Sequence, residues 1–507
     1  MRVLVIGLDG VDWNVIDHMA HKGVLTTIPA LAERGRWAIL RSTIPPITVT
    51  AWASFATGSN PGKHGCFSFL LPGRSLAEKR PISSRDMKVK TFYEILEENG
   101  RKCVLINLPL SYPPRIRSGI VITSILTRGD NFVFPRNILL KVPEFRKYRL
   151  VPNSSLYIMG RTADYVRDVR NLERVRFRCA MKLMRLVDWD LFFVLFSGTD
   201  WIHHVAYDKI FAKSTEEAVR REIYGFYKEL DTYIELMIKN VPSDTLVIVM
   251  SDHGFKTYRG LFSLNAWLSK RGLLKQELTA PSTYSHLVEE SVGRKATIRW
   301  MSRLSAMTLS KLCNKIDIGS QLLLFIASKI SPIMPMLSHL KLETRPLIDE
   351  TIAYTPDMNS HGIYINLMGK FVDGIVNPSE YEDIRNEIIG ELKGMREPRG
   401  RKTLFKAVLR KEDVYRGGEL DRAPDILVVP RNYSVEWNNP LVILRERPFN
   451  FHNLHGILIM YGSRGCDVKY NVENDSTVDI YDVAPTILTA LGVEKPRYMD
   501  GRTLIHL

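Results

Sequence analysis

The sequence predicts an α/β protein in which a central, mostly parallel sheet is flanked by helices. Short apolar runs recur along the chain, helical patterns lie between them, and 507 residues suffice for a large core. The apolar runs have the length and the β-branched or aromatic content of strands buried on both faces. They are Val3–Ile6, Val104–Ile106, Leu191–Phe196, Leu246–Met250, Ile363–Ile365, Ile426–Val429 and Ile457–Met460.

The intervening segments have the spacing of helices. Thr91–Asn99 reads TFYEILEEN and ends at Gly100, a residue suited to the end of a helix, and Ala218–Lys239 is a longer helical pattern. Between strands of this kind, helical crossovers return the chain to the same edge of the sheet, so the alternation favours an α/β sandwich.

Residues 266–345 interrupt this alternation. The segment is rich in Ser, Leu, Met, Lys and Arg, and Trp300, Leu304 and Met307 fit one helical stripe. We therefore expect a core formed by 1–265 and 346–507, with 266–345 as a helical insert or cap. The alternative is an amphipathic surface through which the insert contacts anionic lipid or a partner.

Composition narrows the class of protein. With 45% hydrophobic and 25% charged residues the chain resembles soluble globular proteins, and its formal charge of +15 favours anionic partners. The five cysteines lack CxxC spacing, which argues against a disulfide framework or a thiolate zinc site. The N-terminus, MRVLVIGLDG, has no secretory h-region, so we expect a cytoplasmic protein. A phosphorylated small molecule is the expected partner, and specific nucleic-acid binding is not expected.

Polar residues follow the predicted strands directly. In an open α/β sheet, ligands gather at the carboxyl ends of the strands, so side chains that are distant in sequence can converge there. Carboxylates combined with imidazoles suit zinc or manganese without any cysteine. The residues in question are Asp9, Asp200, His204, Asp252, His253, His452 and His455.

The spacing within two of these groups supports a shared site. Asp200 and His204 are four residues apart, so on a helical turn they face the same way. Asp252 and His253 are adjacent, and a regular strand would direct them to opposite faces, but Gly254 can supply a turn that brings them together.

Familiar phosphate-binding motifs are absent from the glycine-containing stretches. Residues 45–65 read PPITVTAWASFATGSNPGKHG, which fails the GxxxxGK[ST] pattern because His64 follows Lys63. GLDG at 7–10 lacks both GxGxxG and the first Asp of a DxDG signature. What remains is a threonine-rich turn that leads into an apolar helix.

Six stretches that span nearly the whole chain carry a family pattern. They are GLDG (7–10), PPITVTAW…TGSNPGKHG (45–65), GTDWIHH (198–204), SDHGF (251–255), HNLHGILIMYG (452–462) and DVAPTILTALGV (482–493) with MDG (499–501). Together and in this order, they resemble the type I phosphodiesterase/nucleotide pyrophosphatase family of the alkaline phosphatase superfamily. The resemblance implies an alkaline-phosphatase-like sandwich and a metal-dependent hydrolase of phosphate esters.

The resemblance also implies roles for individual residues at a first cation. Asp9, Asp252 and His253 match ligands of one divalent metal ion, and Thr48 matches the nucleophile, which would contact the same ion. Thr50 and Ser42 are weaker candidates for the nucleophile.

A second cation is implied by the remaining matches. Asp200 and His204 match its ligands, and the last ligand should be the histidine that precedes the GILI strand. His452 fits the family spacing of four residues before Gly456, whereas His455 is the rival position. Zinc is the expected metal, with manganese as the alternative.

The implied reaction is attack by Thr48 on phosphorus, which gives a phosphothreonine intermediate that water then cleaves. The chain departs from nucleotide-cleaving members at Ala51, where those members carry an asparagine, so nucleotide specificity is in doubt and a phosphodiester is the favoured substrate. The alternatives are a phosphoryl transferase or mutase of the same superfamily, and a non-catalytic relative that binds a membrane or a partner.

Overall fold

A nine-stranded sheet forms the centre of the protein in a computed structural model that describes residues 1–279, 343–356, 361–398, 400–436 and 442–506. The strand order is β23-β2-β21-β9-β1-β8-β5-β6-β7, and β9, β1, β8, β5 and β6 run parallel to one another. The prediction of a central, mostly parallel sheet is confirmed. The strands are β1 (Arg2–Leu8), β2 (Arg36–Arg41), β5 (Cys103–Leu108), β6 (Ile120–Thr123), β7 (Val133–Phe134), β8 (Leu191–Phe196), β9 (Thr245–Met250), β21 (His455–Gly462) and β23 (Ser476–Asp479).

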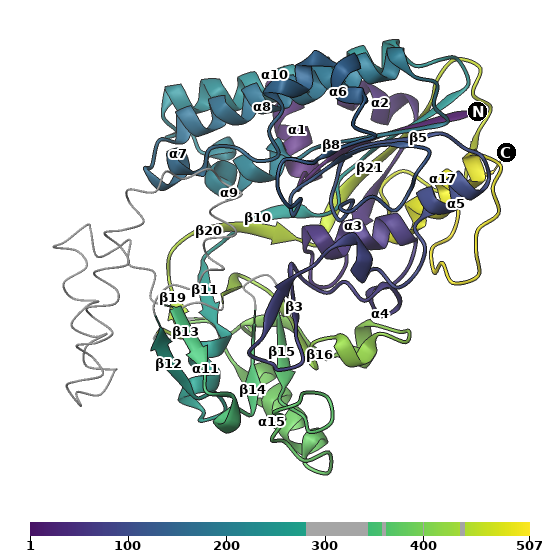
Figure 1. Ribbon diagram of the computed structural model, residues 1–507. Helices are drawn as coiled ribbons and strands as arrows, with labels where there is room; N and C mark the ends of the chain where they lie inside the picture. The colour runs from purple at the N-terminus through teal and green to yellow at the C-terminus, as the bar shows by residue number, and fades with distance from the viewer. Residues whose placement is uncertain (280–342, 357–360, 399, 437–441, 507) are drawn as a thin grey trace.

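Helices cover both faces of this sheet (Figure 1). Alternate residues of β1 point to opposite faces, so that Val3 and Val5 join one apolar cluster while Leu4 and Ile6 join the other. This two-sided burial explains why the strand is apolar throughout. One face packs against α1 (Trp13–His21), α2 (Thr27–Arg34), α8 (Thr162–Leu186), α9 (Gly198–Phe211) and α10 (Glu217–Lys239), and the other against α3 (Thr48–Thr57), α5 (Phe92–Glu98) and α17 (Val483–Ala490).

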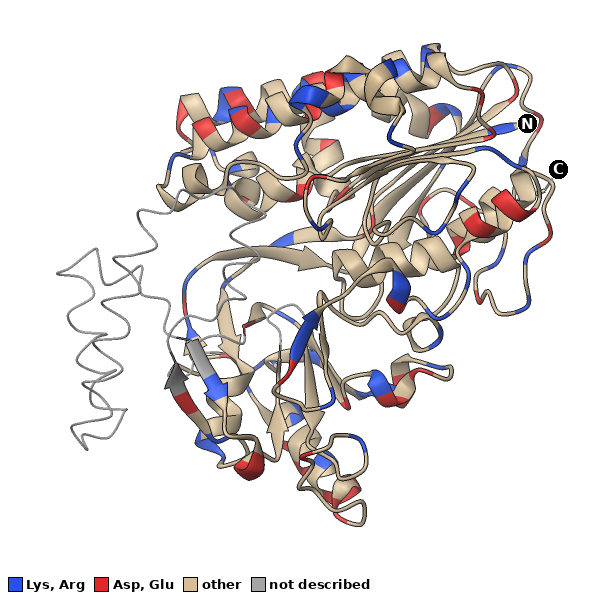
Figure 2. Ribbon diagram, in the orientation of Figure 1, with Lys and Arg blue, Asp and Glu red and all other residues tan. Residues whose placement is uncertain are grey.

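Charges of both signs alternate on the outer helices α8 and α10 (Figure 2). Arg170 bonds to Glu222 and to Glu229, both at 2.5 Å, and Arg174 also donates to Glu229 at 2.9 Å. Part of the chain's positive charge is therefore matched within this layer, which packs over α9.

A second lobe has its own apolar core and its own antiparallel sheet of order β14-β15-β17-β16. Ile363–Ile365 and Ile426–Val429 are buried strands as predicted, but their placement in the parallel sheet is wrong. An apolar run reveals burial on two faces without revealing the direction of its neighbours. The lobe contains β14 (Ala353–Tyr354), β15 (Gly362–Ile365), α15 (Tyr381–Gly394), β16 (Phe405–Arg410) and β17 (Ile426–Pro430).

A two-stranded antiparallel ribbon, β10 (Gly254–Tyr258) with β20 (Phe449–Asn453), runs from the main sheet towards the second lobe (Figure 1). Beyond it, β11 (Gly260–Ser263) pairs with β18 (Tyr433–Glu436) and with β19 (Leu444–Arg445). Because β10 follows β9 directly, its pairing with β20 brings residues 449–453 to the end of β9.

The segment 266–345, predicted as a helical insert, lies for the most part outside the described residues. Its described ends hold the last turn and a half of α11 (Leu264–Lys270) and a ribbon of β12 (Gln276–Thr279) with β13 (Glu343–Pro346). The domain division and the role of residues 280–342 stay predictions. Among the described residues, no helix combines the length and the apolar character needed to cross a bilayer.

The remaining α-helices and strands are short. They are α4 (Pro61–His64), β3 (Leu70–Pro72), β4 (Lys79–Pro81), α6 (Ile138–Lys141), α7 (Ser154–Ile158), α16 (Lys411–Val414), β22 (Lys469–Tyr470) and β24 (Ile505–His506).

Candidate active site

The carboxyl ends of three adjacent parallel strands define the site. In register, Gly7 of β1 pairs with Leu195 of β8 on one side and with Met250 of β9 on the other. The residues that follow these positions therefore emerge side by side at one edge of the sheet. The structure brings all seven predicted site residues together there: Asp9, Thr48, Asp200, His204, Asp252, His253 and His452.

A first cluster forms around the ring nitrogen Nε2 of His253. This atom lies 3.3 Å from Asp252 Oδ2, 3.6 Å from Asp9 Oδ1 and 3.4 Å from Thr48 Oγ1. All four side chains are buried. The opposite ring nitrogen, Nδ1, is 3.1 Å from the carbonyl oxygen of Gly254, and because a carbonyl only accepts, Nδ1 carries the proton.

A second cluster forms around Asp200. Its Oδ1 lies 3.1 Å from His452 Nε2 and 3.4 Å from His204 Nε2, and the two imidazole nitrogens are 3.2 Å apart. His452 Nδ1 donates to the carbonyl oxygen of Pro46 at 2.9 Å, which fixes its tautomer as for His253. The rings of His253 and His452 stack with centroids 3.7 Å apart, so the two clusters adjoin.

Local backbone features direct these side chains. Thr48 is the first residue of α3 and follows Pro45 and Pro46, whose fixed φ favours an extended entry into a helix. Asp200 lies in the first turn of α9 with His204 one turn later, as the spacing predicted. His452 reaches the site from β20, where it pairs in register with Phe255 of β10.

The predicted role of Gly254 as a turn residue is wrong. Its backbone does not adopt a positive φ, so conformational freedom is not what the position needs. A Cβ at Gly254 would instead lie 2.1 Å from the carbonyl oxygen of His455. Glycine is required because β10 passes close to β21 here. The turn is held by Ser251, whose Oγ donates to the His253 carbonyl oxygen at 2.5 Å and accepts the Val11 amide at 2.8 Å.

Burial and mutual repulsion dominate the electrostatics of the carboxylates. Burial raises the pKa of Asp9 well above its usual value, and the nearby charges of Asp252 and Asp200 raise it further. Burial and the charge of Asp200 likewise raise the pKa of Asp252. Burial opposes ionisation of Asp200 too, but His204 and His452 hold the pKa of this carboxyl well below its usual value.

These side chains fit a pair of divalent cations. Burial lowers the pKa of His253 well below its usual value, so this ring is neutral and its Nε2 lone pair faces the oxygens of Asp9 and Asp252. Asp9 Oδ1 and Asp252 Oδ2 are buried and have no hydrogen-bond partner among the described residues. Lone pairs directed at unpartnered anionic oxygens repel one another, and a cation held between them removes this repulsion. Oxygen and imidazole donors are those that zinc and manganese accept.

The alternative candidates for the last ligand and for the nucleophile are placed differently from His452 and Thr48. His455 is exposed at the start of β21, in contrast to the buried His452. The hydroxyls of Thr50 and Ser42 are buried, but neither hydrogen-bonds to any described residue. Of the hydroxyls considered from the sequence, Thr48 is the one with a direct contact to the clusters.

Sequence reasoning missed His203. Its ring is fully buried, with Nδ1 2.8 Å from the carbonyl oxygen of Gly10 and Nε2 2.5 Å from the hydroxyl of Tyr227. This side chain ties the loop after β1, which carries Asp9, to α9 and α10. The adjacent histidines of TDWIHH could have indicated a separate role for His203. Neighbouring residues on a helix point about 100° apart, so the two histidines cannot both enter one site.

Replacing His452 with glutamine is expected to lower the affinity for the second cation by about 100-fold or more, because an anchored imidazole ligand is lost. Replacing the exposed His455 with glutamine serves as the matched control and should leave the affinity unchanged. Titration of the metal-free proteins with zinc, followed by calorimetry, compares the two. Equal losses in both variants would show that His452 is not a ligand.

Comparisons with known proteins agree with the resemblance drawn from the motifs. The sequence pattern of the family described as "Type I phosphodiesterase / nucleotide pyrophosphatase" matches residues 3–438. No curated protein matches the chain.

Solved structures show the same fold. Phosphonoacetate hydrolase from Sinorhizobium meliloti 1021 is similar with a TM-score of 0.56 and 15% identity, over 97% of this chain and 95% of that chain. The alkaline phosphatase PafA is similar with a TM-score of 0.51 and 13% identity, over 99% and 98% of the two chains. The predicted alkaline-phosphatase-like fold is confirmed. Since the family pattern covers most of its length, the chain belongs to the type I phosphodiesterase/nucleotide pyrophosphatase family, whose members are hydrolases of phosphoric esters.

Proposed function

We propose that this protein hydrolyses phosphate esters, with diesters as the favoured substrates, through a covalent intermediate on Thr48 at a site for two zinc ions. The observation that carries the proposal is the position of the Thr48 hydroxyl. It lies 3.4 Å from the His253 nitrogen that also faces the unpartnered oxygens of Asp9 and Asp252. A hydroxyl in this position can be activated as a nucleophile.

Each of the two clusters would hold one cation. Asp9, Asp252 and His253 would hold one ion next to Thr48. The second cluster, Asp200 with His204 and His452, would hold the other, and ligand atoms of Asp200 also lie within 4.8 Å of those of Asp9 and His253. When bound, two such ions lower the pKa of a coordinated hydroxyl and stabilise the charge that develops on the leaving oxygen. Manganese is the alternative metal, because the donor set is the same.

The start of α3 contributes the remaining stabilisation. A helix leaves the amide groups of its first turn without intrahelical partners, and its N-terminus favours negative charge. Thr48 is the first residue of this ten-residue helix, so a phosphoryl group bonded to its hydroxyl would lie beside these amides. Ala51, which replaces the asparagine of nucleotide-cleaving members, is fully buried in the apolar cluster beneath the sheet and supplies no polar contact.

The proposed reaction has two steps. The Thr48 oxygen forms a bond to phosphorus as the ester P–O bond breaks, and the leaving oxygen takes up a proton to become an alcohol. Water then attacks the same phosphorus and breaks the bond to Thr48. The products are the alcohol and a phosphate or phosphate monoester, and the threonine hydroxyl is restored.

We also propose a cytoplasmic protein whose partner is a phosphorylated small molecule. The positive formal charge of +15 supports an anionic substrate. The alternative of peripheral membrane contact falls on residues 266–345, most of which lie outside the described residues.

A single-turnover experiment tests the proposal. Zinc-loaded protein, in slight excess, is mixed with a nitrophenyl phosphodiester, quenched with acid and digested, and the peptides are analysed by mass spectrometry. We expect a phosphoryl adduct on Thr48 and not on Thr50, although both lie on the same peptide. In ¹⁸O-labelled water, the released phosphate monoester should gain one labelled oxygen. Turnover without any adduct would exclude the covalent route, and product without label would indicate transfer to another acceptor.

A further inference from the structure

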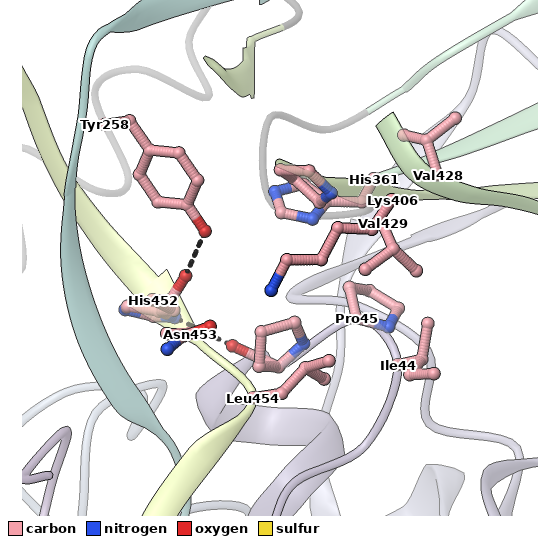
Figure 3. A pocket seen from close by; sticks show the side chains of 12 residues that line it. Ile44, Pro45, Tyr258, His361, Lys406, Val428, Val429, His452, Asn453 and Leu454 are labelled. Carbon is pink, nitrogen blue, oxygen red and sulfur yellow. Dashed lines mark hydrogen bonds between the residues drawn. The ribbon is translucent and has the colours of Figure 1, made fainter. Parts of the chain in front are cut away.

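A small pocket opens beside the second cluster, between the main sheet and the second lobe (Figure 3). We call it the His361 pocket. His452, the predicted cation ligand from β20, forms part of its wall and connects it to the site, and the hydroxyl of Tyr258 donates to the His452 carbonyl oxygen at 2.9 Å. The pocket is lined by Pro45, Tyr258, His361, Lys406, Val429 and His452, among others.

His361 is a buried polar side chain that the proposed reaction does not use. Only 1% of the residue is exposed, and neither ring nitrogen has a hydrogen-bond partner among the described residues. Its φ of 43° lies in the left-handed region, which is costly for a residue with a side chain. An unpartnered buried imidazole on a strained backbone is expensive, so a ligand that satisfies the ring would offset the cost.

The His361 ring lies near Phe451, which also contacts His452. Its centroid lies 5.8 Å from that of Phe451, and Phe451 stacks on His452 with centroids 4.5 Å apart. Burial, with a smaller effect from His452, lowers the pKa of His361 to about 3, so the ring is neutral near physiological pH. A neutral imidazole has one N–H donor and one acceptor nitrogen.

Lys406 brings a positive charge to the same pocket. The residue lies on β16, and Figure 3 shows its ammonium group pointing into the space between Tyr258, His361 and His452. In the described part of the chain, no carboxylate pairs with Lys406. Lys406 is exposed on β16, and much of the pocket wall beside it is apolar, with Ile44 and Val428 among its residues.

We propose that the His361 pocket binds a second anionic group of the substrate, held by the ammonium of Lys406 and a hydrogen bond from His361. The substrate would then be a phosphate ester that carries a carboxylate or a further phosphate close to the ester bond. This inference rests on the proposed hydrolysis at the neighbouring clusters.

Matched substrates test the subsite. The carboxyphenyl and carbamoylphenyl esters of phosphate differ in one anionic group and otherwise have nearly the same shape. We expect the wild-type protein to show the lower KM for the carboxylate ester. Changing Lys406→Met should raise this KM roughly tenfold or more, with little effect on the carboxamide ester. Diphosphate esters tested against the corresponding monoesters distinguish phosphate from carboxylate as the preferred group.

Two control variants separate the role of the pocket from general charge effects. Lys402→Met removes an exposed lysine just before β16, outside the pocket, and should leave both KM values unchanged. Lys406→Arg keeps the charge and should retain the preference for the anionic ester. If Lys406→Met and Lys402→Met change the two KM values alike, the subsite is excluded.

Binding without turnover distinguishes failure of the subsite from failure of the proposed function. Calorimetry of the Thr48→Ala protein with the carboxyphenyl ester should show tighter binding than with the carboxamide, and the added Lys406→Met change should remove the difference. Preferential binding with no hydrolysis by wild type would support the pocket and reject the hydrolase. Hydrolysis of both esters with equal KM and equal binding would reject the pocket alone.

Discussion

Replacing Thr48 with alanine is expected to reduce kcat by about 10³-fold or more while the protein stays folded and keeps its bound metal. The proposed nucleophile is lost, but the carboxylates and imidazoles of both clusters remain. The hydroxyl's one contact to a cluster residue in the described structure, to His253 Nε2, is long at 3.4 Å, so its removal should disturb the ligand geometry little. Steady-state kinetics on a phosphodiester, combined with elemental analysis for zinc, measures both effects.

The neighbouring threonine provides a matched control. Thr50 lies two residues further along α3, is fully buried, and its hydroxyl has no partner among the described residues. Thr50→Val keeps the shape and removes an unsatisfied polar group, so activity should be retained. Full activity in Thr48→Ala would remove Thr48 from its proposed role. Equal loss in both variants would point to damage of α3 rather than to loss of a nucleophile.

The convergence of the site was predictable because it follows from a periodic pattern. Apolar runs at β1, β8 and β9 each end in polar residues, and parallel strands place their carboxyl ends together. Once the strands are assigned, the sequence therefore predicts that Asp9, Asp200 and Asp252 lie at one edge of the sheet. The i, i+4 spacing of His204 relative to Asp200 added one more side chain.

Features that depend on how distant segments pair could not be predicted from the sequence pattern. Spacing within HNLHG leaves His452 and His455 as alternatives. His452 is buried where β20 pairs with β10, whereas His455 begins β21, pairs with Arg41 of β2 and is exposed. The antiparallel sheet of the second lobe was misplaced for a similar reason, since strand direction is set by the partners of a strand. His361 could not be singled out from the sequence, because its significance comes from a pocket assembled by six segments that are distant in sequence.

Removing the cations with a chelator is expected to abolish turnover reversibly and to lower the melting temperature by several degrees. Ligands that bind only the folded state stabilise it, by roughly 4 kcal/mol at a thousandfold excess over Kd. Without cations, the buried carboxylates of Asp9 and Asp252 face each other and the lone pair of His253 with no compensating charge. Activity assays and thermal melts before and after restoration of zinc measure the two effects.

The pH dependence of this destabilisation provides a sharper test. Burial raises the folded-state pKa of Asp9 and of Asp252 above their unfolded values. In the metal-free protein their contribution to stability is therefore full below the unfolded pKa and is lost as the pH rises through the raised folded pKa. The gap in melting temperature between zinc-loaded and metal-free protein should consequently be widest near neutral pH. As the pH falls, protonation of these carboxyls stabilises the metal-free fold and weakens cation binding, and the gap should narrow. A gap that stays constant across this range would mean that Asp9 and Asp252 are not the groups that the cations neutralise.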